Sequence, residues 1–331
     1  MTEEIMRQIE PYYAFPFTEP VPYRDGFLII NDNATLHLKK AEGSPERICF
    51  QQAVKDHLGK NGFPYTDHFV LTKEGLPYVL LEETVYTIST KIQGVEACFE
   101  DPMDLAKAAV ALAAMHTASC GADYDFSAFP FALKDLGGLP AQFDKRIQEL
   151  KKFKKIASRG KGLFDYAYAK CAGYFIEEGE RTLEALQASA YETLVARTRE
   201  QQLVCHHDFT AHNVIFLSKN TYITGFENCC VELKEYDLAN FIRRKMRRTG
   251  WSLSDAKYLL DHYRAICPIS PEEMHVLCIL LRFPQKLWRI VNKYYNSRRS
   301  WCERSCLEKM SDVLAEKDPL TTFLDHFEAI Y

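Results

Sequence analysis

Residues 203–216 read Leu203-Val-Cys-His-His-Asp-Phe-Thr-Ala-His-Asn-Val-Ile-Phe216. This stretch begins with β-prone residues, passes through a polar segment and returns to an apolar run. That pattern predicts two short strands joined by a loop. Asp208 and Asn213 stand in the loop, five positions apart. A strand therefore delivers a carboxylate and a carboxamide into one short connection.

Three interpretations of this loop follow from its residue types. Enzymes that transfer phosphoryl groups use a carboxylate to orient the attacking hydroxyl and a nearby amide to hold a metal ion on the phosphates, at this spacing. Asp208 could instead only cap the turn. His206, His207 and His212 could form a zinc or iron cluster with Asp208, although adjacent histidines in a strand point in opposite directions. We favour phosphoryl-transfer ancestry, with His206 supporting the loop by hydrogen bonding.

Composition excludes several other classes of protein. The chain has 331 residues, 47% of them hydrophobic and 26% charged, which is typical of a folded protein with a sizeable core. A formal net charge of -4 gives no overall attraction to nucleic acid or acidic lipid. No leader-like segment and no apolar run of roughly 18 residues is present. We therefore expect a cytoplasmic protein that binds neither nucleic acid nor membrane.

The cysteines indicate neither a disulfide framework nor a metal site. Eleven cysteines occur at irregular spacings, which favours reduced, mostly buried thiols. Cys229 and Cys230 are adjacent and lack the gap of a zinc knuckle. We expect no zinc.

The pattern along the chain predicts an α+β protein with two lobes. Expected strands cover residues 27–31, 34–39, 68–73, 77–82 and 84–92, and one helix opens at Ser44-Pro45. Gln93-Gly94 is a candidate hinge, after which Asp101-Pro102 opens a mainly helical region. We expect a β-rich N-terminal lobe over residues 1–92 and a mainly helical C-terminal lobe over residues 93–331, which contains the loop.

Several segments resemble known families. His206-His207-Asp208-Phe209 followed by Asn213 resembles the His-Gly-Asp-Phe-x-x-x-Asn loop of aminoglycoside phosphotransferases and choline kinases, with His207 in place of the glycine. Leu112 to His116 and Tyr236 to Ala239 resemble two further motifs of that superfamily. Residues 44–63, and more specifically residues 282–288 with 292–296, are similar to the CotS family of endospore coat proteins. The resemblance implies a two-lobed, protein-kinase-like fold.

The resemblance also implies roles for individual residues. Asp208 would be the catalytic base, Asn213 would bind nucleotide and metal, and Lys39 would hold the nucleotide phosphates. Lys40 is the neighbour that points to the opposite face, and Lys39 could also be an ordinary solvated strand lysine. Glu227 is the remaining candidate metal ligand.

The departures from the family pattern concern nucleotide binding. Gly225 stands where active relatives carry the main magnesium-binding aspartate, and Glu227 lies two residues further, displaced by roughly 7 Å. Gln51 or Gln52 occupies the place of the glutamate that normally pairs with the lysine. A Gly-rich phosphate loop is missing, since only Gly26 precedes the second strand.

Taken together, these features predict a spore-coat-associated, kinase-fold protein with impaired catalysis that acts in binding or coat assembly. ATP and Mg²⁺ binding would be weak or lost, and the partners would be other spore coat proteins. The alternative is an active ATP-dependent kinase that phosphorylates a hydroxyl group of a small molecule, with Asp208, Asn213, Glu227 and Lys39 in the roles above.

Remaining residues are expected to serve structure. Asp237 would be the N-cap of a helix and an anchor for the loop. The basic runs 151–155 and 243–248 would form solvated helix faces rather than polyanion sites. We expect four aromatic residues to pack in the core and between helices: Trp288, Tyr294, Tyr295 and Trp301.

Overall fold

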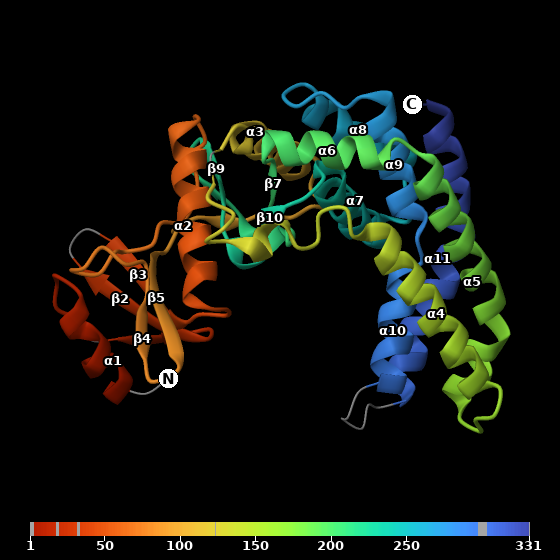
Figure 1. The fold of residues 1–331 in the computed structure, drawn as a ribbon, viewed down its shortest axis with the longest axis horizontal. Helices are drawn as coiled ribbons and strands as arrows, with labels where there is room; N and C mark the ends of the chain where they lie inside the picture. The colour runs from red at the N-terminus through yellow and green to blue at the C-terminus, as the bar shows by residue number, and fades with distance from the viewer. Residues whose placement is uncertain (1–2, 18–19, 32–33, 123, 297–302, 331) are drawn as a thin grey trace. The chain divides into compact units, whose positions relative to one another are not determined.

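The computed structural model describes residues 3–17, 20–31, 34–122, 124–296 and 303–330 (Figure 1). They form two compact units. The first unit comprises residues 1–134, 200–237 and 259–268, and the second comprises residues 135–199, 238–258 and 269–331. The expected β-rich lobe lies wholly inside the first unit, and its boundary at residue 92 stays a prediction. No helix within the described ranges is long and apolar enough to cross a membrane.

An antiparallel five-stranded sheet opens the first unit (Figure 1, red to orange). Its spatial order is β1 (Val21–Tyr23), β2 (Gly26–Asn31), β3 (Ala34–Lys40), β5 (Thr84–Thr90) and β4 (Val79–Leu81). One face packs on helix α1 (Glu3–Ile9). Ile29, Leu36, Leu38 and Ile88 form the core of that face, as alternation along a strand requires. The expected α+β class is confirmed.

The expected strand at 68–73 is wrong. This segment runs beside β5, where the Val70 amide donates to the Ile88 carbonyl, but it makes only an isolated bridge at Phe69. The Thr72 hydroxyl accepts hydrogen bonds from the amides of Glu74 and Leu76, which turns the chain away from the sheet. The fifth strand is instead β1, a three-residue edge strand that contains a proline.

Helix α2 (Pro45–Lys60) begins as expected, with Ser44 at the N-cap position and Pro45 in the first turn. Its buried positions include Phe50, Val54 and Leu58. Helix α3 (Pro102–Ser119) is also confirmed. The Asp101 carboxylate caps it by accepting from the amides of residues 103 and 104.

Two small sheets complete the first unit. Strands β6 (Val95–Glu96), β8 (Val214–Leu217) and β9 (Asn220–Ile223) form one, and β7 (Val204–Cys205) pairs with β10 (Cys230–Val231) in the other. Single 3-10 turns occur at Glu10–Tyr12, Pro130–Leu133, Ala211–Asn213 and Phe226–Asn228. The strand–loop–strand pattern expected around residues 203–216 is therefore confirmed.

The second unit is helical. It contains α4 (Leu139–Ala157), α5 (Leu163–Ala188), most of α6 (Tyr191–Gln201), α9 (Pro271–Arg282), α10 (Gln285–Asn296) and α11 (Glu303–Ile330). Helices α7 (Lys234–Thr249) and α8 (Leu253–Arg264) each belong partly to both units.

Aromatic side chains of α10 pack on α4 and α5, as expected. Tyr294 stacks on Phe164 with ring centroids 3.9 Å apart, and Tyr295 stacks on Phe153 at 5.2 Å. The Trp288 indole donates to the Glu149 carboxylate. The fourth aromatic residue of this expectation, at position 301, lies outside the described residues.

The two basic runs differ in their surroundings. In residues 151–155 the lysines are exposed or half-buried, while Phe153 points into the core, so this run forms the expected solvated face. In residues 243–247 the expectation holds for Arg244 and Arg247, which are exposed, but is wrong for Lys245. Lys245 is buried and pairs with Asp255 at 3.1 Å, while Arg243 and Arg247 line a pocket.

Candidate functional site

A polar cleft of about 400 Å³ lies in the first unit. Its walls come from the β1–β2 turn, β3, the end of β5, the loop after β7 and the segment after β9. The four site residues named from sequence, Lys39, Asp208, Asn213 and Glu227, all line this cleft, as does Gly225. Segments far apart in the sequence are therefore brought together as expected, while the role of each residue remains a proposal.

His206 supports the loop that carries Asp208. The imidazole is fully buried, and its Nδ1 accepts the Asp208 amide at 3.2 Å. Nε2 must then carry the proton, and it donates to the Thr224 carbonyl at 2.9 Å. One side chain thus ties the catalytic-type loop to the segment that precedes Gly225. The expected supporting role of His206 is confirmed.

Asp237 anchors the same loop from below. Its two carboxylate oxygens accept the amides of His206 at 2.6 Å and His207 at 2.8 Å, and the His116 Nε2 donates to it at 3.2 Å. Tyr263 bonds the other nitrogen of His116 at 2.7 Å. The expected N-cap role is wrong, because α7 begins at Lys234 and Asp237 lies within its first turn. The expected anchoring role is confirmed.

The surroundings of Asp237 and His116 determine the charge of each side chain. Burial alone would raise the pKa of Asp237, but the hydrogen bond from His116 and the nearby imidazoles lower it to about 2. Burial lowers the pKa of His116, against the opposing effect of Asp237. At neutral pH the pair is therefore an ionised carboxylate that accepts from a neutral imidazole.

His207 occupies a backbone position that explains the glycine of the family motif. Its φ of 67° lies in the left-handed region, where histidine is among the less disfavoured side chains. Its imidazole stacks on Tyr236, with ring centroids 4.3 Å apart and planes inclined by 13°. This stacking stabilises the histidine side chain at a backbone position where the family motif has glycine.

Asn213 fills the space beside Gly225. Its side-chain amide donates to the backbone carbonyl of Asp208 at 3.0 Å. The backbone carbonyl of Asn213 accepts the Thr224 amide at 2.9 Å. Gly225 has a φ of 82°, and a Cβ placed there would lie 2.7 Å from three side-chain atoms of Asn213. Both the backbone and the packing therefore favour glycine at position 225.

Of the adjacent lysines Lys39 and Lys40, Lys39 faces the cleft. It lies on the opposite face of β3 from the buried Leu36 and Leu38, whereas Lys40 is exposed. The Lys39 Nζ lies 2.6 Å from the Glu227 Oε1. Burial works against both charges, yet the pair raises the pKa of Lys39 and lowers the pKa of Glu227, so both stay ionised.

This ion pair corrects the expectation that Lys39 has lost its partner. Gln51 is buried beside Lys39 in the small hollow behind the cleft, where the sequence placed a glutamine in place of an acid. The acid comes instead from Glu227, 188 positions away in the sequence. Arg47 adds a hydrogen bond to the Glu227 carbonyl at 3.0 Å, which fixes the segment against α2.

Two further ion pairs, in or beside the cleft, were not predicted from the sequence. Lys55 on α2 is almost fully buried, pairs with Asp67 at 2.9 Å and lies over the Phe69 ring at 4.2 Å. The sequence contained a sign that Lys55 is buried, because Lys55 falls on the same helical face as the apolar residues Ile48 and Leu58. A lysine on an apolar face requires a buried acid nearby.

The second pair involves Glu96 of β6. Its carboxylate contacts Arg24 in the β1–β2 turn and His212 after the loop, each at 2.6 Å. Gly26 follows in that turn, where a Cβ would lie 2.0 Å from the Leu38 carbonyl oxygen. A tight turn fixed by an ion pair thus replaces a Gly-rich loop.

The histidine cluster considered for zinc or iron does not form. His206 bonds backbone, His207 stacks on Tyr236 and His212 contacts Glu96. A different group, His116, Cys205 and Asp237, places ligand-type atoms within 4.8 Å of one another. However, burial raises the pKa of Cys205 well above its ordinary value, and its thiol donates to two backbone carbonyls at 3.2 Å. Asp237 accepts from His116 and the Cys205 thiol donates to backbone, so protein groups satisfy these atoms without an ion.

The donors of the cleft do not fit the magnesium site of a kinase. Magnesium needs carboxylate oxygens in a near-octahedral arrangement. Gly225 offers none, and the Glu227 carboxylate is bound to Lys39. Asp67 and Glu96 are likewise paired with basic side chains. The carboxylates of Asp25 and Asp208 also line the cleft, but no carboxylate stands at position 225 beside Asn213.

The chain is similar to known proteins over nearly its whole length. A sequence model of the family described as "Spore coat putative kinase YutH" matches residues 7–327. The chain belongs to this YutH spore coat family. It is also 25% identical over 337 aligned positions to spore coat protein S of Bacillus subtilis, covering 99% of this chain and 95% of that protein. The CotS-type resemblance is confirmed.

Solved structures support the fold of this YutH-family chain. An aminoglycoside phosphotransferase from Alicyclobacillus acidocaldarius aligns with a TM-score of 0.81 and 19% identity, over 96% of this chain and 94% of its own. A spectinomycin phosphotransferase, solved with ADP and spectinomycin, aligns with a TM-score of 0.62 and 14% identity, over 99% and 98%. The chain is a spore coat protein homologue with an aminoglycoside-phosphotransferase-like fold.

Proposed function

We propose that this YutH-family protein is a spore-coat-associated pseudokinase, which acts through binding or coat assembly rather than through efficient phosphoryl transfer. Its resemblance to spore coat protein S over nearly the whole chain supports the coat context. The observation that carries the loss of catalysis is Gly225, which lies against Asn213 without a carboxylate. Partners would be other spore coat proteins.

Charge in the cleft supports the same proposal. A nucleotide phosphate would have to compete with Glu227 for Lys39, and a metal ion would have to compete with Lys39 for Glu227. Each would break a half-buried ion pair whose two charges then need new partners. ATP and Mg²⁺ binding is therefore weak or lost.

The competing function is an active kinase for a hydroxyl group of a small molecule. It is favoured by the presence of Lys39, Asp208 and Asn213 in one cleft, and by the ADP of the spectinomycin phosphotransferase. In that case Asp208 orients the hydroxyl, Lys39 holds phosphate, and Asn213 with Glu227 holds the metal. It requires the Lys39–Glu227 pair to separate.

Titration calorimetry with ATP and Mg²⁺ distinguishes the two functions. We expect little heat from the wild type. A magnesium-dependent dissociation constant in the low micromolar range, lost in Asp208→Asn, would establish the kinase alternative.

A second arm uses Glu227→Gln, which frees the Lys39 ammonium but removes a carboxylate. Under the pseudokinase proposal this variant binds ATP more tightly than the wild type in magnesium-free buffer, and adding Lys39→Met removes the gain. If Glu227 is a metal ligand of an active kinase, Glu227→Gln instead weakens binding in the presence of Mg²⁺.

A further inference from the structure

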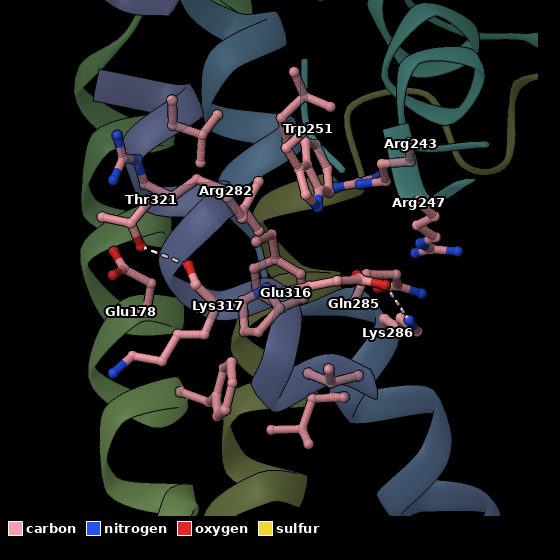
Figure 2. Close-up of a pocket in the computed structure, with 18 of the residues that line it drawn as sticks. Glu178, Arg243, Arg247, Trp251, Arg282, Gln285, Lys286, Glu316, Lys317 and Thr321 are labelled. Carbon is pink, nitrogen blue, oxygen red and sulfur yellow. Dashed lines mark hydrogen bonds and ion pairs between the residues drawn. The ribbon is translucent and has the colours of Figure 1, made fainter. Parts of the chain in front are cut away.

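A second pocket lies in the second unit and shares no residue with the polar cleft. It has a cavity volume of about 60 Å³ and is lined by side chains of α5, α7, α9, α10 and α11 (Figure 2). Six consecutive residues, 282–287, line it. They belong to the family-specific segment, so the most distinctive stretch of the sequence builds a pocket rather than the catalytic-type cleft.

Trp251 gives the pocket a hydrogen-bond donor without an acceptor. The residue is only 7% exposed, its ring lies 5.4 Å from that of Phe323, and its Nε1 has no hydrogen-bond partner. Figure 2 shows the indole nitrogen turned toward the interior of the pocket. A buried N–H without an acceptor is unfavourable, because it loses its hydrogen bond to water. An acceptor bound in the pocket would remove this penalty.

The backbone holds Trp251 in this position. Helix α7 ends at Thr249, and Gly250 and Trp251 both adopt left-handed φ angles, 83° and 59°. Their two amides bond the Met246 carbonyl at 2.8 and 3.2 Å. A bulky residue in this conformation is strained, and such strain persists where the surrounding structure fixes it.

Positive charge predominates around the pocket. Five basic and two acidic side chains line it. Lys286 pairs with Glu316 at 2.7 Å (Figure 2). Arg282 contacts Glu328, which lies outside the lining, at 3.3 Å.

Arg243 donates to the Leu280 carbonyl, and Lys317 lies 3.7 Å from Asp318 and over the Tyr174 ring, so Arg247 is the lining cation left to consider. Its guanidinium forms no hydrogen bond with the residues that the structure describes. Arg247 as a residue is exposed, but partial burial of its guanidinium and the repulsion of Arg289 and Arg244 lower its pKa, against the attraction of Glu316. The repulsion between these cations would decrease if an anion were bound beside them.

The first turn of α10 adds backbone donors. The helix begins at Gln285, so the amides of Lys286 and Leu287 have no acceptor within the helix, and its positive end lies at the pocket. Phe283 and Leu324 line the pocket with apolar surface. The arrangement combines an indole donor, a guanidinium and a helix N-terminus around a small, partly apolar hollow.

We propose that this pocket binds the oxyanion group of a small molecule, a phosphate or a carboxylate, through the Trp251 indole and the Arg247 guanidinium. A cavity of about 60 Å³ holds such a group with a short apolar attachment and is too small for a nucleotide. Arginine matches both kinds of oxyanion with two parallel hydrogen bonds. The family-specific segment 282–287 thereby serves recognition of an anion.

Calorimetry with inorganic phosphate, phenyl phosphate and benzoate tests this site. We expect saturable binding of at least one probe by the wild type, and the arm that binds most tightly identifies phosphate or carboxylate as the group. Trp251→Phe keeps an aromatic ring, although a smaller one, and removes the donor, and Arg247→Gln removes the charge. Each should weaken binding about tenfold, as expected for one hydrogen bond. Arg304→Gln, an exposed arginine of α11 outside the pocket, should change nothing.

Two results would overturn the proposal. One is the absence of saturable binding of all three probes by the folded wild type. The other is binding that Trp251→Phe and Arg247→Gln leave unchanged. If Trp251→Phe does not fold, Arg247→Gln decides, since it removes a repelled charge and should fold. The cleft variant Asp208→Asn should bind the probes like the wild type, which separates this site from the proposed pseudokinase cleft.

Discussion

At the scale of single residues, Gly225 and Asn213 act as one unit. Asn213 uses the space that a side chain at position 225 would fill, and its amide bonds the loop that carries Asp208. Restoring a carboxylate there therefore means more than replacing a missing ligand. The side chain of Asn213 must shift, and a non-glycine residue must accept a left-handed backbone.

We predict that Gly225→Asp tightens magnesium-nucleotide binding about tenfold and lowers the free energy of unfolding by about 1–2 kcal/mol. Aspartate is one of the side chains that enter the left-handed region at modest cost. Calorimetry and urea denaturation measure the two quantities on the same variant. Gly225→Asn serves as the matched control, since it has nearly the same shape and strain but no charge. Equal binding by both variants would show that position 225 is not the missing metal ligand.

Residue pairs set a limit on what the sequence could predict. Lys39, Asp208, Asn213 and Glu227 were identified as cleft residues because each lies in or near a motif of fixed spacing. The bond between Lys39 and Glu227 was not predicted, because it joins positions 188 residues apart and depends on how strand β3 and the turn Phe226–Asn228 are placed in space. The left-handed backbone of His207 was equally hidden, although the glycine of the family motif pointed to it.

At the scale of elements, local sequence patterns explain which helices and strands were predicted correctly and which were not. Helices α2 and α3 begin where a proline follows a serine or an aspartate, and their apolar positions recur at helical spacing. The segment 68–73 has the composition of a strand, but hydrogen bonds of the Thr72 hydroxyl turn the chain. Side-chain bonds of this kind compete with a sheet ladder and leave no periodic signal.

The loop after β7 depends on an anchor outside its own strand. Asp237 of α7 accepts two loop amides and the His116 imidazole in a fully buried position. We predict that Asp237→Asn lowers the free energy of unfolding by about 2 kcal/mol or more, because the neutral amide accepts fewer and weaker bonds. Leaving His116 with a changed partner adds to the cost.

The same anchor predicts the pH dependence of stability. The pKa of Asp237 is depressed to about 2 from an ordinary value of 3.8, so its contribution is fully present above pH 4 and is lost as the pH falls toward 2. The shift corresponds to about 2 kcal/mol. His116 acts in the same direction, since its lowered pKa means that the unfolded chain binds its proton more readily as the pH falls below about 6.5. Urea denaturation between pH 7 and pH 2.5 measures both effects. A wild type and an Asp237→Asn variant with parallel curves below pH 4 would contradict the assignment.

At the scale of the whole molecule, chemistry is divided between the two units. The first unit contains the kinase-type cleft, in which Glu227, Asp67 and Glu96 pair with basic side chains. The second contains the pocket built by the family-specific segment. A protein that has lost its metal ligand but keeps an anion-binding pocket can retain recognition without catalysis, as one fold commonly hosts different functions.

The thiols give the last prediction, because they report on the whole fold at once. Each of the ten described cysteines is free, six of them are buried, and Cys98 is exposed. Burial raises the pKa of Cys229 to about 12 and that of Cys278 to about 12, which suppresses the reactive thiolate at neutral pH. We expect a thiol reagent to label Cys98 rapidly in the native protein and the buried cysteines only after unfolding, and Cys98→Ser to remove that rapid phase. A chelator should leave the melting temperature unchanged, since His116, Cys205 and Asp237 are satisfied by protein groups. Stoichiometric zinc whose removal unfolds the chain would show instead that these three residues hold an ion.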